Sequence, residues 1–450
     1  MLSGCIFTSE RPPLTGIPDR YATANGDSAP PALDWWRAFN SLELTSLIEE
    51  AQTANFNIGA AIARILQADA QAKVSGAPLL PALQYDGFAQ RSWPPGGGVR
   101  EDYKSWFTAS YEIDFWGKNR AILVAAQENA AATRFAKEVV VLTTVVSVGT
   151  AYLQVLVSQD RLRIARQNLA AATRVLDLIK QRFNAGTASQ LDIAQQESVV
   201  ASVRANIPLF DQTLRQNIAL LAVLIGRPPI DLKVRGGSLY SLKIPRVTPG
   251  MPSELLFQRP DIRLAEANLA SAEARVAAAR AAFFPSISLT GQSGHENPLL
   301  KALFRPESFF WSVATSLTQP LLDGFRLEGQ LEAANGKQIE LMKIYCQSIL
   351  SAFGDVETAL IAIQDGAERE RLQRLAVIAS RQAFNISETR LREGTLDLVT
   401  VLQTQQTLFT AEDLLVQARL ARLQAVLSLY QALGGSWLPP GVEATAKLGQ

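Results

Sequence analysis

The stretch Arg182-Phe-Asn-Ala-Gly186-Thr187 recurs in outline as Arg390-Leu-Arg-Glu-Gly394-Thr395. Each copy is followed by a polar helical run that ends in a glycine, Gly226 after the first copy and Gly434 after the second. The arginine, the glycine, the threonine and the terminal glycine keep one constant spacing with no gap. A Gly-Thr pair between two long helical patterns indicates a helix C-cap followed by the N-cap of the next helix. Each copy therefore predicts an αα-hairpin with a tight tip, and the pair predicts a duplicated architecture.

The rest of the chain also falls into two similar halves, each reading helix, strand-loop-strand, long helix, tip and return helix. We predict an N-terminal lipidation site and extended tether over residues 1–32, a first repeat over 33–229, a connector over 230–252, a second repeat over 253–435 and a C-terminal tail over 436–450. The expected strands cover about 79–92, 106–115, 285–293 and 309–318, and the expected tips cover 184–188 and 392–396. The expected helices cover about 42–73, 118–183, 253–282 and 326–391, with return helices that end near 224 and 433. The predicted class is mainly α with a small β part.

The period of the sequence changes in the expected strands. Apolar Phe107, Ala109 and Tyr111 alternate with polar Thr108 and Ser110, which predicts a strand with one apolar and one polar face. Four such strands, each of roughly ten residues, fit a transmembrane β-barrel. Four strands cannot close a barrel, and an open edge is not viable in lipid. Three copies would supply about twelve strands, whereas a small soluble antiparallel sheet is the alternative that the residues leave open.

One helical run lacks charge and is long enough to cross a bilayer. Val139 to Gln159 contains no charged residue. Its counterpart in the second half, Cys346 to Gly366, contains carboxylates at 355, 357 and 365. Equivalent positions of a duplicated fold share an environment, and three carboxylates do not suit lipid. We therefore predict a buried helix face rather than a spanning helix.

Composition gives no sign of catalysis. The 43 basic and 42 acidic residues nearly balance, so no nucleic-acid partner is implied, and two cysteines make no disulfide framework. The single histidine, His295, is expected in a solvated loop between Ser293 and Glu307, and Cys346 is expected to pack inside a long helix. Gly336-Lys337-Gln338 lacks the spacing of a phosphate loop. We expect no catalytic residue, cofactor or metal.

The first residues have a different signature. Leu2-Ser3-Gly4-Cys5 has the pattern of a bacterial lipobox, and the Pro/Gly/Ser-rich stretch from 11 to 31 is typical of an extended tether. A lipidated Cys5 would be a firm membrane anchor. A four-residue match also leaves open an accidental coincidence in a cytosolic tail.

Several runs together resemble a known family. They are Asp34-Trp35-Trp36-Arg37-Ala38-Phe39, the run from Leu44 to Ala51, Pro252-Ser253-Glu254-Leu255-Leu256 with Arg259-Pro260-Asp261-Ile262-Arg263 and Glu266, Phe284-Pro285-Ser286-Ile287 with Leu289-Thr290-Gly291, and the paired tips. From Leu33 to Trp437 the chain resembles the TolC-type outer-membrane efflux family, specifically the NodT/OprM-like lipoprotein branch that serves resistance-nodulation-division pumps.

That resemblance implies a homotrimer whose strands form one shared 12-stranded barrel in outer-membrane lipid and whose helices form a periplasmic tunnel. It implies that Cys5 carries the lipid. It also implies that the tips meet a periplasmic adaptor, which couples the duct to an inner-membrane resistance-nodulation-division transporter. The expected adaptor-contacting residues are Arg182, Gly186, Thr187, Arg390, Gly394 and Thr395. Asp397 and Asp192, just after the tips, are the candidates for the side chains that narrow the closed aperture.

The leading hypothesis is a gated exit duct that releases small molecules, drugs among them, when the tips dilate. A protein-secreting duct of the type I kind shares the fold, and a coiled-coil scaffold lipoprotein is a reading of another class. The alternating strands favour a duct, because a scaffold has no need of a lumen-facing and a lipid-facing side.

Overall fold

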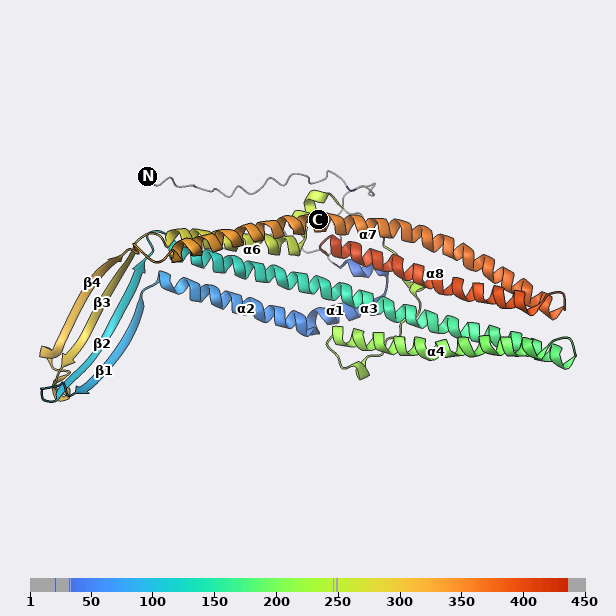
Figure 1. Ribbon diagram of the computed structural model, residues 1–450, viewed down its shortest axis with the longest axis horizontal. Helices are drawn as coiled ribbons and strands as arrows, with labels where there is room; N and C mark the ends of the chain where they lie inside the picture. Colours follow the sequence, from blue (N-terminus) through green and yellow to red (C-terminus); the bar gives the residue numbers. More distant parts are fainter. Residues whose placement is uncertain (1–20, 22–31, 33, 246, 248–249, 436–450) are drawn as a thin grey trace, which may run out of the picture. The chain divides into compact units, whose positions relative to one another are not determined.

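The computed structural model describes Tyr21, Ala32, residues 34–245, Val247 and residues 250–435, and Cys5 lies outside these residues. The chain divides into two compact units (Figure 1). The first unit holds Ile62–Ala136 and Asp261–Ser348, and the second holds most of the described remainder.

The first unit contains an antiparallel sheet of four strands in the order β1-β2-β3-β4. The strands are β1 (Ala82–Ser92), β2 (Arg100–Ile113), β3 (Ser286–Asn297) and β4 (Phe309–Thr318). The helices that belong to this unit in whole or in part are α2 (Phe56–Gly76), α3 (Lys118–Asn184), α6 (Pro260–Ala281) and α7 (Arg326–Arg392). The second unit adds α1 (Leu42–Ala54), α4 (Gln190–Leu224), α5 (Leu255–Gln258) and α8 (Leu398–Ala432).

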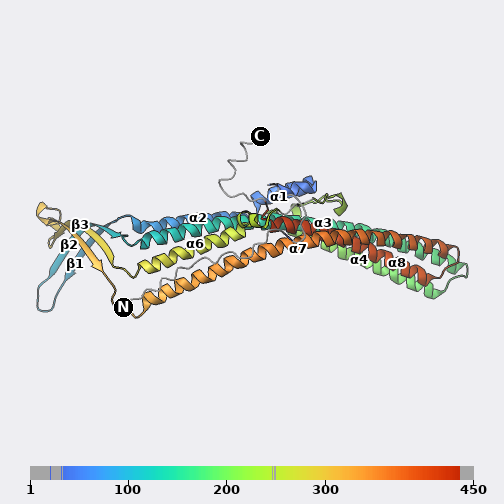
Figure 2. The ribbon, with the colours of Figure 1, turned by 90° about the horizontal axis from the view of Figure 1, so that it is seen from above.

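The long helices of the two halves have identical lengths. α3 and α7 each have 67 residues, and α4 and α8 each have 35. The offset that carries Lys118 onto Arg326 also carries Gln190 onto Leu398. We call this constant shift the repeat offset, and positions that it relates are called equivalent. The structure confirms the duplicated hairpins, and both tips lie at the same end of the second unit (Figures 1 and 2).

Two expected helices are each broken in the structure. The helix expected over 42–73 is split at Asn55, whose side-chain Oδ1 accepts from the backbone N–H of Asn57 and Ile58 and so starts a new helix. Its Nδ2 donates to the Leu224 carbonyl at 2.7 Å, a partner that is remote in sequence. The helix expected from 253 is broken before Pro260, which lacks the N–H that a continuous helix needs.

The strand boundaries also differ from those expected. β1 begins at Ala82 rather than 79, because Ala77–Leu79 form a 3-10 turn. β2 begins at Arg100 rather than 106, because it pairs with the whole of β1, from Ser110 opposite Ala82 to Arg100 opposite Ser92.

The loop expected from Ser293 is wrong over its first residues, because β3 continues to Asn297. His295 therefore lies in a strand, opposite Ser105 of β2 and Phe309 of β4. Its ring packs edge-on against Phe304 and Phe309, with both pairs of ring centroids 5.7 Å apart, so it is a half-buried packing residue.

The uncharged run of α3 is a core element of the second unit. α3 and α7 are both long and apolar enough to cross a bilayer by length and composition. In α3, however, Val148 and Val155 are 0% exposed and pack with Leu423 and Val426 of α8. Leu153 and Leu156 belong to the same cluster. The run is therefore a buried helix face, as the sequence predicted.

Candidate functional site: hairpin tips, sheet faces and connector anchors

The first tip closes through main-chain hydrogen bonds. Gly186 has φ 75°, a left-handed conformation that glycine adopts without strain. The Thr187 N–H donates to the Arg182 carbonyl at 2.8 Å, and the Thr187 hydroxyl donates to the same oxygen. This six-to-one bond is the Schellman end of α3. Ala185 to Thr187 are exposed, so the tip is open to solvent in the protomer.

The second tip repeats this geometry. Gly394 has φ 78°, and the Thr395 N–H donates to the Arg390 carbonyl at 3.0 Å. A Cβ added at Gly394 would meet nothing within 4 Å, and the same is true at Gly186. Both tips therefore require glycine for backbone conformation and leave the space around it open.

The N-cap that follows each tip is two residues later than the Gly-Thr pattern indicated. Ser189 caps α4 by accepting from the Asp192 N–H, and the Asp192 carboxylate accepts from the Ser189 N–H at 2.7 Å. Asp397 caps α8 by accepting from the Thr400 N–H at 2.9 Å. Thr187 and Thr395 instead contribute to the helix C-caps before them.

The carboxylates of Asp192 and Asp397 thus both lie at helix N-termini, where the helix dipole favours negative charge. Hydrogen bonds from the Thr400 backbone and side chain hold the pKa of the Asp397 carboxyl below its ordinary value. Asp397 is fully exposed and Asp192 is half-buried, so both can present charge at the tips.

The two tips are joined to each other within the protomer. The Arg182 guanidinium donates to the Leu391 carbonyl at 2.6 Å, at the C-terminal end of α7. Behind this bond, Val175 and Ile179 of α3 share a hydrophobic core with Leu391 and Val401 of the second hairpin. The side chains of Arg182 and Leu391 therefore fix one tip against the other.

The sheet has two chemically different faces, because residues directly opposite in an antiparallel ladder point the same way. One face carries Leu83, Tyr85, Phe107, Tyr111, Ile113, Ile287, Leu289, Trp311, Val313 and Leu317. The other carries Gln84, Asp86, Thr108, Ser110, Ser288, Thr290, Gln292, Ser312 and Ser316. Trp311 is 72% exposed and Leu317 is 68% exposed, so no described residue of the protomer covers the apolar face.

Charged side chains that the sequence reasoning missed hold the connector between the halves. Glu43 of α1 accepts from the N–H groups of Arg235 and Gly236 at 2.8 and 2.9 Å. Asp160 of α3, 0% exposed, accepts from the Ser238 hydroxyl and the Leu239 N–H. The useful signal was the position of Asp160, the first charge after the uncharged run of α3.

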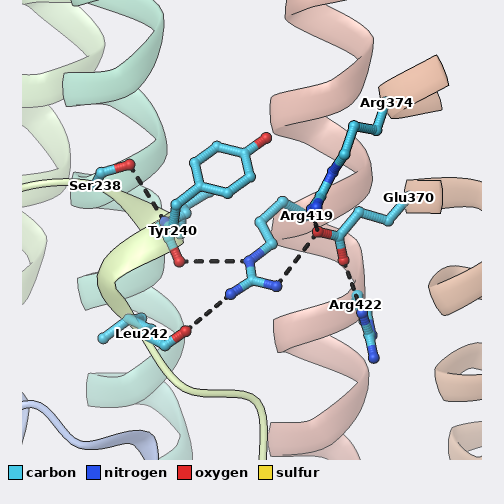
Figure 3. Close-up of polar contacts among 8 residues, drawn as sticks. Ser238, Tyr240, Leu242, Glu370, Arg374, Arg419 and Arg422 are labelled. Carbon is cyan, nitrogen blue, oxygen red and sulfur yellow. Dashed lines mark hydrogen bonds and ion pairs between the residues drawn. The ribbon is translucent and has the colours of Figure 1, made fainter. Parts of the chain in front are cut away.

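The third anchor comes from α8 (Figure 3). The Arg419 guanidinium donates to the carbonyls of Leu239 and Leu242 at 3.4 and 2.8 Å. It also pairs with Glu370 of α7, which is 2% exposed and accepts from Arg374 and Arg422 as well. Three arginines around one buried carboxylate bind α7, α8 and the connector together.

No catalytic constellation is present in the described ranges. Among these residues no group of three or more His, Cys, Asp and Glu side chains could hold a metal ion. Cys346 is a half-buried residue inside α7. Arg259 donates to the Ala432 carbonyl at 3.0 Å and pairs with Asp355, so it serves helix packing.

A sheet with one exposed apolar face and one polar face, and paired long hairpins, are typical of a membrane channel subunit. The sequence profile described as Outer membrane efflux protein matches residues 47–227 and 251–435. The chain therefore belongs to the outer membrane efflux protein family, and it is an outer-membrane efflux channel protein with periplasmic helices.

Relatives and solved structures agree with this assignment. The pyoverdine export outer membrane protein OpmQ of Pseudomonas aeruginosa is 39% identical over 432 residues, which cover 93% of this chain and 90% of the relative. OpmQ of Pseudomonas putida is 40% identical over 453 residues, which cover 97% and 96%. The structure of the outer-membrane channel OprN superposes with a TM-score of 0.87 at 26% identity and covers 94% of this chain and 98% of that chain.

Proposed function

We propose that three copies of this chain form the exit duct of a tripartite efflux pump. The observation that carries the proposal is the open sheet, in which β1 and β4 are the edge strands and one face is apolar. In lipid, each unpaired edge group costs several kcal/mol, so the edges must pair. Pairing β4 of one copy with β1 of the next closes a barrel of about twelve strands.

The helices of the three copies then form the periplasmic tunnel, and the exposed tips are its inner mouth. We assign docking of a periplasmic adaptor to Arg182, Gly186, Thr187, Arg390, Gly394 and Thr395. The support is geometric, since both glycines are exposed and have open space around them. The adaptor couples the duct to an inner-membrane resistance-nodulation-division transporter, which supplies the energy for transport.

Opening of the duct is a displacement of the tip hairpins. Asp192 and Asp397, one per tip, narrow the closed mouth in this proposal, because three copies of each would place like charges around one opening. Cys5 is the lipid attachment site that fixes the N-terminus to the membrane. The cargo is a small molecule, and the likeness to two pyoverdine exporters favours secreted metabolites of that chemical kind alongside drugs.

The test is complementation in a strain that lacks its own outer-membrane efflux channel but retains the pump and adaptor. The chain should restore drug resistance and metabolite export, and the purified trimer should conduct ions in a planar bilayer. Gly186→Val and Gly394→Val should reduce resistance while the trimer still assembles, because a β-branched residue strains the left-handed backbone of each tip, although a Cβ there meets no neighbour within 4 Å. Recovery of the wild-type chain in the soluble fraction would contradict the proposal.

A further inference from the structure

One stripe of α3 lies in the cores that the two hairpins share. Its members recur at the alternating spacing of three and four residues typical of coiled-coil contacts. They are Ile164, Asn168, Ala171, Val175, Leu178 and Arg182, all buried or half-buried. Val175 is 0% exposed, and Ile164 and Leu178 pack against the hydrophobic clusters of the second unit.

The repeat offset carries this stripe onto α7, where every member is exposed. The equivalent residues are Leu372, Ala376, Ala379, Ala383, Ile386 and Arg390. Leu372 is 50% exposed and Ile386 is 47% exposed, although their equivalents in α3 are packed. The same face of the same helix is thus covered in one repeat and uncovered in the other.

The arginines at the end of the two stripes show the same contrast. Arg182 donates to the Leu391 carbonyl, whereas the exposed Arg390 side chain has no hydrogen bond or ion pair to any residue that the structure describes. The residue equivalent to Leu391 is Phe183. Its carbonyl accepts the Gly186 N–H at 2.9 Å, just as Leu391 accepts the Gly394 N–H at 3.1 Å. A carbonyl oxygen has two lone pairs, so Phe183 can accept a second donor as Leu391 does.

We infer that the α7 stripe is the contact surface for a second copy of this chain, and that Arg390 makes between copies the bond that Arg182 makes within one. The Arg390 guanidinium donates to the Phe183 carbonyl of the neighbouring copy, and the first hairpin of that copy covers Leu372 and Ile386. The inference rests on the proposed trimer and specifies which helix faces join its protomers at the tip end.

When the repeat offset is applied to side-chain ion pairs between the hairpins, the equivalent residues cannot form the same pair. Arg161 pairs with Asp413 at 2.6 Å, but their equivalents are Arg369 and Ala205. A main-chain carbonyl is present whatever the side chain, so the bond at the tip is the polar contact that duplication can keep. Because each arginine binds a main-chain carbonyl, the arginine of the Arg-xxx-Gly-Thr pattern is present in both tips although the neighbouring positions differ.

A pair of cysteine variants tests the surface with a matched internal control. Arg174 and Glu388 face each other between the hairpins of one protomer, 3.9 Å apart. Their equivalents are Gln382 and Lys180. In a Cys346→Ala background, Arg174→Cys/Glu388→Cys should be cross-linked within one chain by a short bifunctional thiol reagent. Lys180→Cys/Gln382→Cys should instead be cross-linked between chains, and should give covalent dimers and trimers on a denaturing gel.

The outcomes separate this inference from the proposed function. Covalent trimers from Lys180→Cys/Gln382→Cys, but not from either single variant, support the α7 surface. An intact trimer on a native gel with only monomers after cross-linking would overturn the surface and leave the duct standing. That is also the result expected if an adaptor, rather than a second copy, covers the stripe. A chain that is monomeric before any cross-linking would overturn the proposed function itself.

The role of Arg390 is tested by comparing its alanine variant with the alanine variant of the nearby Arg392. Arg390→Ala should lose most of the trimer that resists denaturing detergent at low temperature, whereas Arg392→Ala should retain it. Arg392 is another exposed arginine in the same turn and pairs with Glu388 of its own helix. Circular dichroism of both variants should show the wild-type helical content, because the Arg390 side chain supports nothing inside the protomer. Equal trimer stability in the two variants would refute the role of Arg390.

Discussion

Ser189 and Asp397 occupy equivalent positions in the two tips, and each accepts a hydrogen bond from the backbone N–H three residues further on. The first cap is the Ser189 hydroxyl, with the Asp192 carboxylate accepting from the Ser189 N–H in return, whereas the second cap is itself a carboxylate. Asp192 and Thr400, the donors in the two caps, are equivalent to each other as well. Both tips therefore keep the same capping geometry, but the carboxylate is at the third helical position in the first tip (Asp192) and at the N-cap in the second (Asp397).

The second tip should consequently be sensitive to acid. The Thr400 hydrogen bonds lower the pKa of Asp397 in the folded state below the unfolded value of about 3.9. A carboxyl with a lowered pKa stabilises the fold above its unfolded pKa, and the contribution is lost as the pH falls through the folded pKa. Hydrogen exchange at the start of α8 should therefore accelerate in acid beyond its intrinsic pH dependence.

Asp397→Asn is the control for that experiment, because asparagine also caps helices but carries no titrating charge. The variant should keep the cap at neutral pH and lose the acid-dependent opening of α8. An unchanged acid response in Asp397→Asn would show that another group is responsible.

The glycines that end the return helices should tolerate substitution less well than those at the tips. Gly226 and Gly186 both have φ 75°. A Cβ at Gly226 would lie 2.4 Å from the Ala54 carbonyl oxygen, whereas a Cβ at Gly186 would meet nothing within 4 Å. Gly186→Ala should cost about 1–2 kcal/mol, the cost of a left-handed alanine. Gly226→Ala adds a backbone clash, so its yield of folded protein should fall well below that of Gly186→Ala.

Local chemistry explains which features could be predicted from sequence. The hairpins depend on Gly186, Gly394 and their immediate neighbours, so their signal is contained in six residues. The break at Asn55 depends on the Leu224 carbonyl, and the extension of β3 through His295 depends on pairing with β2. Neither partner is adjacent in sequence, and a periodicity read along one segment therefore missed both.

The residues of the candidate site also fall into those that could be predicted from sequence and those that could not. The tip residues stood out because the pattern occurs twice, whereas the connector anchors occur once. Asp160 and Arg419 have no equivalents in the described residues that hold a second connector. Their role depends on Leu239, which each of them contacts from a different helix. Only the folded chain brings those three segments together.

Glu370 should be the most sensitive carboxylate of the second unit. It is 2% exposed and accepts from Arg374, Arg419 and Arg422, so Glu370→Gln would leave three guanidinium groups without their shared counter-charge. Removing one partner from a buried ion cluster costs about 3–5 kcal/mol. Denaturant unfolding of the protein should show a loss of that size. Glu368→Gln is the matched control, because Glu368 pairs with Arg371 at the surface, where an ion pair adds little.

Tyr152 should report on the anchor at Glu43 through its own titration. Burial, and then the neighbouring Glu43 carboxylate, raise the pKa of the Tyr152 hydroxyl to about 12, and that hydroxyl donates to Glu43 at 3.1 Å. The raised pKa means that Tyr152 stabilises the fold below its unfolded pKa of about 10, and that this contribution is lost as the pH rises through about 12. Subtracting the phenolate absorbance of Tyr152→Phe from that of the wild type should therefore isolate one tyrosine that ionises at a higher pH than a free tyrosine.

The Tyr152→Phe variant should unfold about 0.5–1.5 kcal/mol more easily at neutral pH, the usual loss for one hydrogen bond. The Arg235 and Gly236 N–H groups still satisfy Glu43, so the connector should stay attached, and its release in Tyr152→Phe would contradict the three-anchor arrangement.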